Sequence, residues 1–186
     1  MGRNYSTALI LPPLILGLLL AASNWRLIRE NKRLSDTASY YSSLRHTPTG
    51  VKLPDLHGKS LDGQDLTISY KGVEQQTLLL VFSPTCPHSK RNWPTWLDLV
   101  RGADGKRVVF VNAGGALPAD FSQSYSFDSG TVMAEASPES ILRYSLLEYP
   151  ITILVSPDGR SEKVWSGELG STEVSDIKKL LYRSTP

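Results

Sequence analysis

The chain has 186 residues, of which 40% are hydrophobic, and a formal net charge of +2 at pH 7, which suits one domain of ordinary size with an appended segment. Residues 1–33 hold five Lys/Arg and one acidic residue, a charge of +4, so residues 34–186 carry −2 by subtraction (+2 minus +4). The slightly negative charge of residues 34–186 gives no support to nucleic-acid binding. The single cysteine excludes an internal disulfide, so cysteine usage does not report the redox compartment.

The N-terminal segment has no charged residue between Arg3 and Arg26, and residues 8–22 are apolar apart from a proline pair and a glycine. A helix needs ~20 such residues to cross a bilayer, so residues 1–25 are predicted to be a transmembrane anchor. A cleaved signal peptide is the alternative, because Ala21-Ala22-Ser23 resembles a cleavage site. The basic residues that follow the span favour a cytoplasmic domain by the positive-inside rule.

Residues 26–48 are predicted to be a juxtamembrane helix and linker. Within them, residues at spacings of 4, 3, 4 and 3 would form one seam of a coiled coil. A homodimer through residues 27–41 is one interpretation, and a solvated spacer helix is the other. The residues of this seam are Leu27, Asn31, Leu34, Ala38 and Tyr41.

Residues 49–186 are predicted to form an α/β domain, because strand patterns alternate with helix patterns. The run 78–82 is apolar throughout, as is typical of a central strand covered on both faces. The expected strands cover residues 66–70, 78–82, 107–111, 131–133, 151–155 and 162–165, and the expected helices cover residues 86–100, interrupted at Pro94, 138–147 and 173–182.

The cysteine, Cys86, lies in Ser83-Pro84-Thr85-Cys86-Pro87-His88-Ser89, directly after the apolar run 78–82. A buried strand therefore delivers the thiol to a turn, and Pro87 occupies a natural first position of a helix. The unpaired N–H groups of the first helical turn, with the helix dipole, favour a thiolate over a thiol. Burial as a small hydrophobic residue is the alternative role for a lone cysteine.

Residues 51–181 resemble membrane-anchored proteins of the redoxin (TlpA-like) group of the thioredoxin-like superfamily. The resemblance implies a three-layer sandwich with a mixed central sheet, and a cis peptide bond before Pro150 that faces the thiol. It rests on a hairpin pattern over Val51–Leu66, on Pro94 eight residues after Cys86, on Tyr149–Gly159 as the cis-proline loop, strand and turn, and on Trp165-Ser166-Gly167 before a closing helix.

The chain departs from that group at Ser89, where the second cysteine of a Cys-x-x-Cys motif is expected. Ser89 is either a hydrogen-bond donor to the thiolate or the residue left after loss of that cysteine. His88 is either a thiolate-stabilising cation or a solvated surface residue. The three histidines match no metal-ligand spacing, so neither a metal nor another cofactor is predicted.

The resemblance also implies where a substrate binds. The loop backbone at Tyr149-Pro150 would pair with an extended peptide, with Pro87 beside it. Cys86, His88 and Ser89 are the predicted catalytic residues.

Three functions follow as hypotheses. The first is monothiol exchange at Cys86 with protein thiols and disulfides or glutathione. The second is a non-catalytic binding module in which Cys86 is a vestige. The third, a peroxidase, is weaker, because Leu79 stands where peroxiredoxins have a proline, although Ser83 fits their hydroxyl position. The resemblance places the domain on the extracytoplasmic (periplasmic) side of the membrane, against the charge rule.

Overall fold

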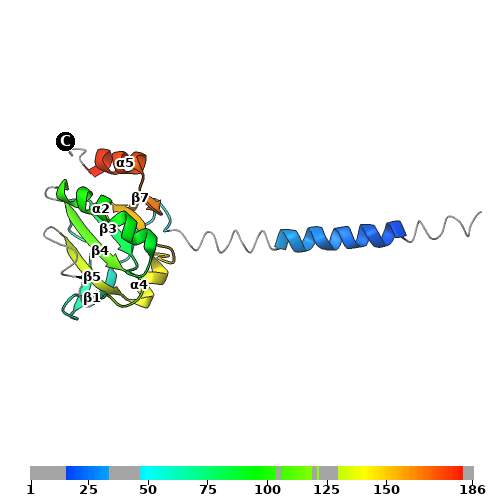
Figure 1. Cartoon of the computed structure of the whole chain (residues 1–186), viewed down its shortest axis with the longest axis horizontal. Helices are drawn as coiled ribbons and strands as arrows, with labels where there is room; N and C mark the ends of the chain where they lie inside the picture. The colour runs from blue at the N-terminus through cyan, green and yellow to red at the C-terminus, as the bar shows by residue number, and fades with distance from the viewer. Residues whose placement is uncertain (1–15, 34–46, 104–105, 119–120, 122–129, 182–186) are drawn as a thin grey trace, which may run out of the picture. The chain divides into compact units, whose positions relative to one another are not determined.

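The computed structural model describes residues 16–33, 47–103, 106–118, 121 and 130–181 (Figure 1). They belong to two compact units, of which the first is Met1–Leu44 and the second Arg45–Pro186.

The described part of the first unit is a helix over residues 16–33, on which the guanidinium of Arg29 lies 5.6 Å from the ring centroid of Trp25. No helix among the described residues is long and apolar enough to cross a membrane. The predicted anchor and the predicted dimer seam both extend outside the described residues, over 1–15 and 34–41 respectively. Anchor and dimer therefore stay predictions.

The second unit is built on a seven-stranded sheet with the order β2-β1-β5-β4-β3-β6-β7. β3 is parallel to β4 and β4 to β5, whereas the other neighbours are antiparallel, so the mixed sheet expected from the sequence is confirmed. The strands are β1 (Leu56–Ser60), β2 (Asp65–Ile68), β3 (Thr77–Phe82), β4 (Arg107–Asn112), β5 (Thr131–Ala136), β6 (Ile151–Val155) and β7 (Ser161–Ser166).

Two hydrophobic cores lie on the two faces of this sheet, because successive side chains of a strand point to opposite faces. In β3, Leu79 and Val81 belong to one core, and Leu78, Leu80 and Phe82 to the other. The second core is covered by α2 (Pro87–Arg101) and α5 (Ser171–Leu181). The first is covered by the segment around Leu53, by Tyr144 and by α4 (Pro138–Arg143). The result is the predicted three-layer sandwich.

The predicted interruption of the first helix at Pro94 is wrong, since α2 continues through this residue. Trp93 and Trp96, on either side of it, are both buried in the second core and hold the helix in place. Pro94 itself is exposed, so water can reach the backbone carbonyl that the missing N–H leaves unpaired.

Most predicted bounds differ from the structure by one or two residues, and two differ by three or more. The helix expected over residues 138–147 ends at Arg143, because Ser145 takes a φ of 54°, a left-handed conformation that ends helices. The strand expected over 131–133 continues to Ala136, where it pairs with β1.

Candidate active site

Cys86 is the residue at which the chain enters α2. The strand β3 ends at Phe82, and the backbone N–H of Cys86 donates to the carbonyl of Ser83, 3.2 Å away, to close the intervening turn. Cys86 is the N-cap, with φ −77° and ψ 119°, and Pro87 begins the helix, as predicted. No side chain caps this helix, and the thiol is partly exposed. The free N–H groups of the first turn can therefore stabilise negative charge beside Cys86.

The loop before β6 lies against the thiol. The Tyr149–Pro150 peptide bond is cis, as expected, and the Sγ of Cys86 donates to the carbonyl oxygen of Tyr149 over 3.5 Å. The sheet explains this contact, because Val81 at the end of β3 pairs with Ile151 at the start of β6. The turns that adjoin these strand ends are thus neighbours in space.

The side chain of Tyr149 connects this loop to the end of β4. Its hydroxyl donates to the carbonyl of Ala113 at 2.7 Å and also lies 3.1 Å from that of Leu146. Burial, and to a smaller extent the charge of Cys86, raise the pKa of the Tyr149 phenol. Gly114 packs so closely here that a Cβ would lie 2.4 Å from Cβ of Ser83 and 3.1 Å from Cε2 of Tyr149.

Ser89 is buried on the inner side of the first turn of α2. Its hydroxyl oxygen accepts a hydrogen bond from the backbone N–H of Ser83, 3.3 Å away. In this structure the serine therefore connects the helix to the end of β3.

His88 and Arg91, on the exposed side of the same helix, share one carboxylate. Nδ1 of His88 lies 2.6 Å from Oε1 of Glu168, and Nε and Nη2 of Arg91 lie 2.9 and 2.7 Å from the same oxygen. Nη2 of Arg91 also lies 2.8 Å from this Nδ1, so the three side chains form one hydrogen-bonded cluster. These hydrogen bonds, that of Arg91 first, lower the pKa of Glu168.

Sequence reasoning missed Arg91 and Glu168. Arg91 could have been found, because it lies three residues after His88 on a predicted helix and thus on the same face. Glu168 could not, because 80 positions separate it from His88.

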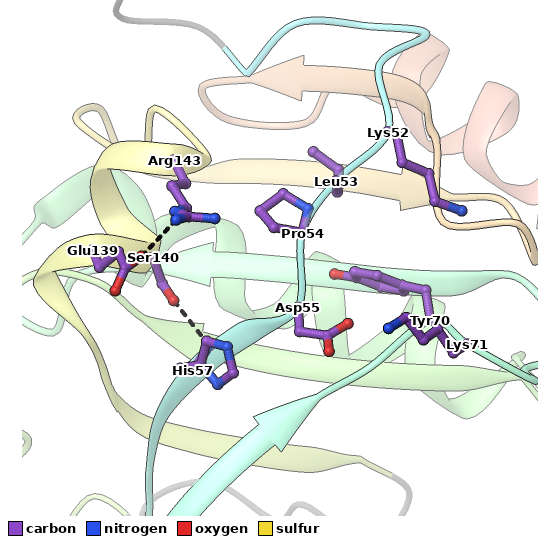
Figure 2. Close-up of a pocket in the computed structure, with 10 residues that line it drawn as sticks. All are labelled: Lys52, Leu53, Pro54, Asp55, His57, Tyr70, Lys71, Glu139, Ser140 and Arg143. Atoms are coloured by element: carbon purple, nitrogen blue, oxygen red, sulfur yellow. Dashed lines mark hydrogen bonds and ion pairs between the residues drawn. The ribbon is translucent and has the colours of Figure 1, made fainter.

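A separate cavity of about 420 Å³ has none of Cys86, Tyr149 and Pro150 in its lining (Figure 2). Its wall includes Lys52, whose backbone forms an isolated β-bridge with Arg160 in the turn between β6 and β7. That turn lies near the start of β3, whereas Cys86 follows the end of β3. Tyr70 lines this cavity, and its hydroxyl lies 3.0 Å from that of Tyr144. The hydroxyl of Tyr144 in turn donates to the carbonyl of Pro54. These bonds hold the segment before β1 on the core.

In the described ranges, no three His, Cys, Asp or Glu residues gather as metal ligands would.

Comparisons with known proteins bear on the fold. Neither a protein-family model nor a curated protein matches the chain. Among solved structures, a peroxiredoxin-like protein from Aquifex aeolicus is similar at 16% identity, with a TM-score of 0.57 over 73% of this chain and 88% of that one. The thioredoxin domain of a thiol-disulfide oxidoreductase from Bacteroides vulgatus is 18% identical, with a TM-score of 0.55 over 72% and 98% of the two chains. For a thio-disulfide isomerase from Thermus thermophilus the identity is 18% and the TM-score 0.52, over 74% and 99%.

These similarities show that the chain has the fold of the thioredoxin-like superfamily, which is the fold that the sequence resemblance predicted.

Proposed function

We propose that the protein carries out monothiol thiol–disulfide exchange through a mixed disulfide at Cys86. The observation that supports this most directly is the position of the thiol, partly exposed at the N-cap of α2 and 3.5 Å from the Tyr149 carbonyl. A cysteine at a helix N-terminus forms the thiolate more readily than a free cysteine does, and the thiolate is the nucleophile in thiol–disulfide exchange. The solved structures with the same fold include a thiol-disulfide oxidoreductase and a thio-disulfide isomerase.

The proposed reaction has two steps. The Cys86 thiolate attacks one sulfur of a protein or glutathione disulfide, a new S–S bond forms to Cys86, and the other sulfur leaves with the electron pair and takes a proton from water. A second, external thiolate then attacks the mixed disulfide, and Cys86 leaves as a thiolate. Each step exchanges one S–S bond for another, so the protein itself is neither oxidised nor reduced over a cycle.

The external thiol is required because Ser89 stands one turn from Cys86 and has no sulfur. We therefore expect isomerisation of disulfides or removal of glutathione from proteins, and little net reduction of disulfides. A substrate in extended conformation would lie along Tyr149 and Pro150, beside Pro87.

The experiment is the reaction of the full chain with glutathione disulfide at pH 6, followed by intact mass spectrometry. We expect one glutathione per chain, removed by added thiol, and a rate about tenfold above that of the chain unfolded in denaturant. The unfolded chain is the matched control, because it holds the same thiol without the fold. A native chain that reacts no faster than the unfolded one would contradict the proposal and favour the binding module.

We further propose that the N-terminal segment anchors the protein in a membrane with the domain on the extracytoplasmic side. The uncharged stretch between Arg3 and Arg26 and the exposed leucines of the helix over residues 16–33 support an apolar environment for this segment. A membrane-impermeant maleimide should then label Cys86 in intact cells, and should also label an introduced thiol in Gln64→Cys, at an exposed position. Labelling of both only after lysis would place the domain in the cytoplasm.

A further inference from the structure

Glu168, in the loop after β7, contacts the first turns of α2 through its side chain. Its Oε1 receives hydrogen bonds from Arg91 at 2.7 and 2.9 Å, and Nδ1 of His88 lies 2.6 Å from the same oxygen. Both nitrogens of the guanidinium bond to one carboxylate oxygen, and these hydrogen bonds are charge-assisted.

The backbone on both sides of Glu168 is held in place. The N–H of Gly167 donates to the carbonyl of Pro150 at 2.8 Å, in the loop that faces the thiol. The N–H of Leu169 donates to Oδ1 of Asn92, which is buried in α2, at 2.9 Å. The backbone of Glu168 therefore has a defined position beside the site, from which its partly exposed carboxylate reaches α2.

The charged or titratable side chains of this cluster are His88 and Arg91, two and five residues after Cys86 on α2, and Glu168 from the loop after β7. Tyr149, in the loop before β6, contacts the thiol through its backbone carbonyl. The hydrogen bond to Glu168 is the main reason that the pKa of Arg91 is raised, and the charge of Cys86 raises it further. Arg91 contacts the carboxylate directly, and Cys86 at the start of the same helix lies within range of its charge. The negative charge of Glu168 offsets the positive charge of Arg91, which would otherwise stabilise the thiolate.

We propose that Glu168 is a positioning residue that restrains Arg91 and His88 and thereby limits the reactivity of the Cys86 thiolate. Arg91 is the cation that favours the thiolate, and Glu168 sets how strongly it does so. The inference rests on the proposed exchange reaction at Cys86, because only there does thiolate formation matter.

The test is the rate of alkylation of Cys86 by iodoacetamide between pH 5 and pH 10. We expect Glu168→Gln to lower the midpoint of this pH profile by about half a pH unit, the size typical of exposed charge interactions. Arg91→Gln should raise the midpoint by a similar amount. Both shifts should shrink in 1 M salt, because the screening length there is about 3 Å.

Arg101→Gln is the matched control, since Arg101 pairs with Asp98 at 2.9 Å on the same helix, far along from Cys86. The midpoint of thermal unfolding of each variant shows whether the substitution has disturbed the structure or has changed only the charge. The inference would be overturned if Glu168→Gln and Arg91→Gln moved the midpoint of the pH profile in the same direction. It would also be overturned if they moved the midpoint no further than Arg101→Gln does. Exchange with glutathione disulfide is measured in parallel: opposite shifts without exchange would support the role of Glu168 and contradict only the proposed function.

Discussion

The thiol of Cys86 lies 3.5 Å from the carbonyl oxygen of Tyr149, although 63 positions separate the two residues in the chain. The contact joins the end of β3 to the start of β6, and Tyr149 extends it to the end of β4 through Ala113. Three segments distant in the sequence thus meet around one thiol.

Ser89→Cys should convert the site into a dithiol site. The new thiol would stand three residues after Cys86 in the first turn of α2, on the same face of the helix. We expect a disulfide between the two cysteines in air, seen as a loss of two hydrogen masses. We also expect measurable reduction of insulin disulfides, which the natural chain should lack.

Ser89→Ala is the control for this change. Both variants lose the hydrogen bond that Ser83 N–H donates to Ser89, which costs about 1 kcal/mol of stability. Only Ser89→Cys should gain the ability to reduce insulin disulfides. A Ser89→Cys protein with two free thiols after oxidation would mean that the first turn of α2 is not placed as described.

Gly114→Ala should disturb the surroundings of the thiol. The added Cβ would lie 2.4 Å from Cβ of Ser83 and 2.6 Å from its Oγ, so the turn before Cys86 or the loop after β4 must move. Such overpacking costs about 1 to 3 kcal/mol. We expect a lower midpoint of thermal unfolding together with a changed alkylation rate of Cys86.

Gly115→Ala is the matched comparison at the next position. No atom lies within 4 Å of a Cβ there, but the φ of 89° disfavours a side chain. The cost should be about 1 kcal/mol, from the backbone alone, with little change in the alkylation rate. Equal effects of both variants on the thiol would contradict the close contact at Gly114.

Alkaline pH should destabilise the domain through Tyr70 and Tyr144. Burial raises the pKa of Tyr70 to about 12, and burial also raises the pKa of Tyr144. The unfolded chain loses these protons near the ordinary value of 10.0, while the folded chain retains them. Stability is therefore fully present below pH 10 and falls between pH 10 and pH 12, by about 2 to 3 kcal/mol for Tyr70 alone.

Urea unfolding at pH 9, 10.5 and 11.5 measures this loss. Tyr70→Phe removes the titrating group, so its stability should depend less steeply on pH over this interval. Equal slopes in the natural chain and the variant would show that Tyr70 titrates in the folded state as it does when unfolded.

Much of the fold could be predicted from the sequence because its signals are local. The apolar run of β3, the turn at Ser83 and the proline after Cys86 place the thiol at the start of a helix with no information from the rest of the chain. Pro94 misled the same reasoning, because burial of Trp93 and Trp96 outweighs the hydrogen bond that a proline removes.

The sequence by itself determined that one cysteine stands at a helix N-cap and that the residue one turn later carries no thiol. Only the tertiary structure decided which charges surround that cysteine. Glu168 reaches His88 and Arg91 because β7 lies two strands from β3, with β6 between them, and its following loop is held by Asn92 and Pro150. Backbone conformation follows from neighbouring residues, whereas the partner of a charged side chain depends on the order of the strands in space.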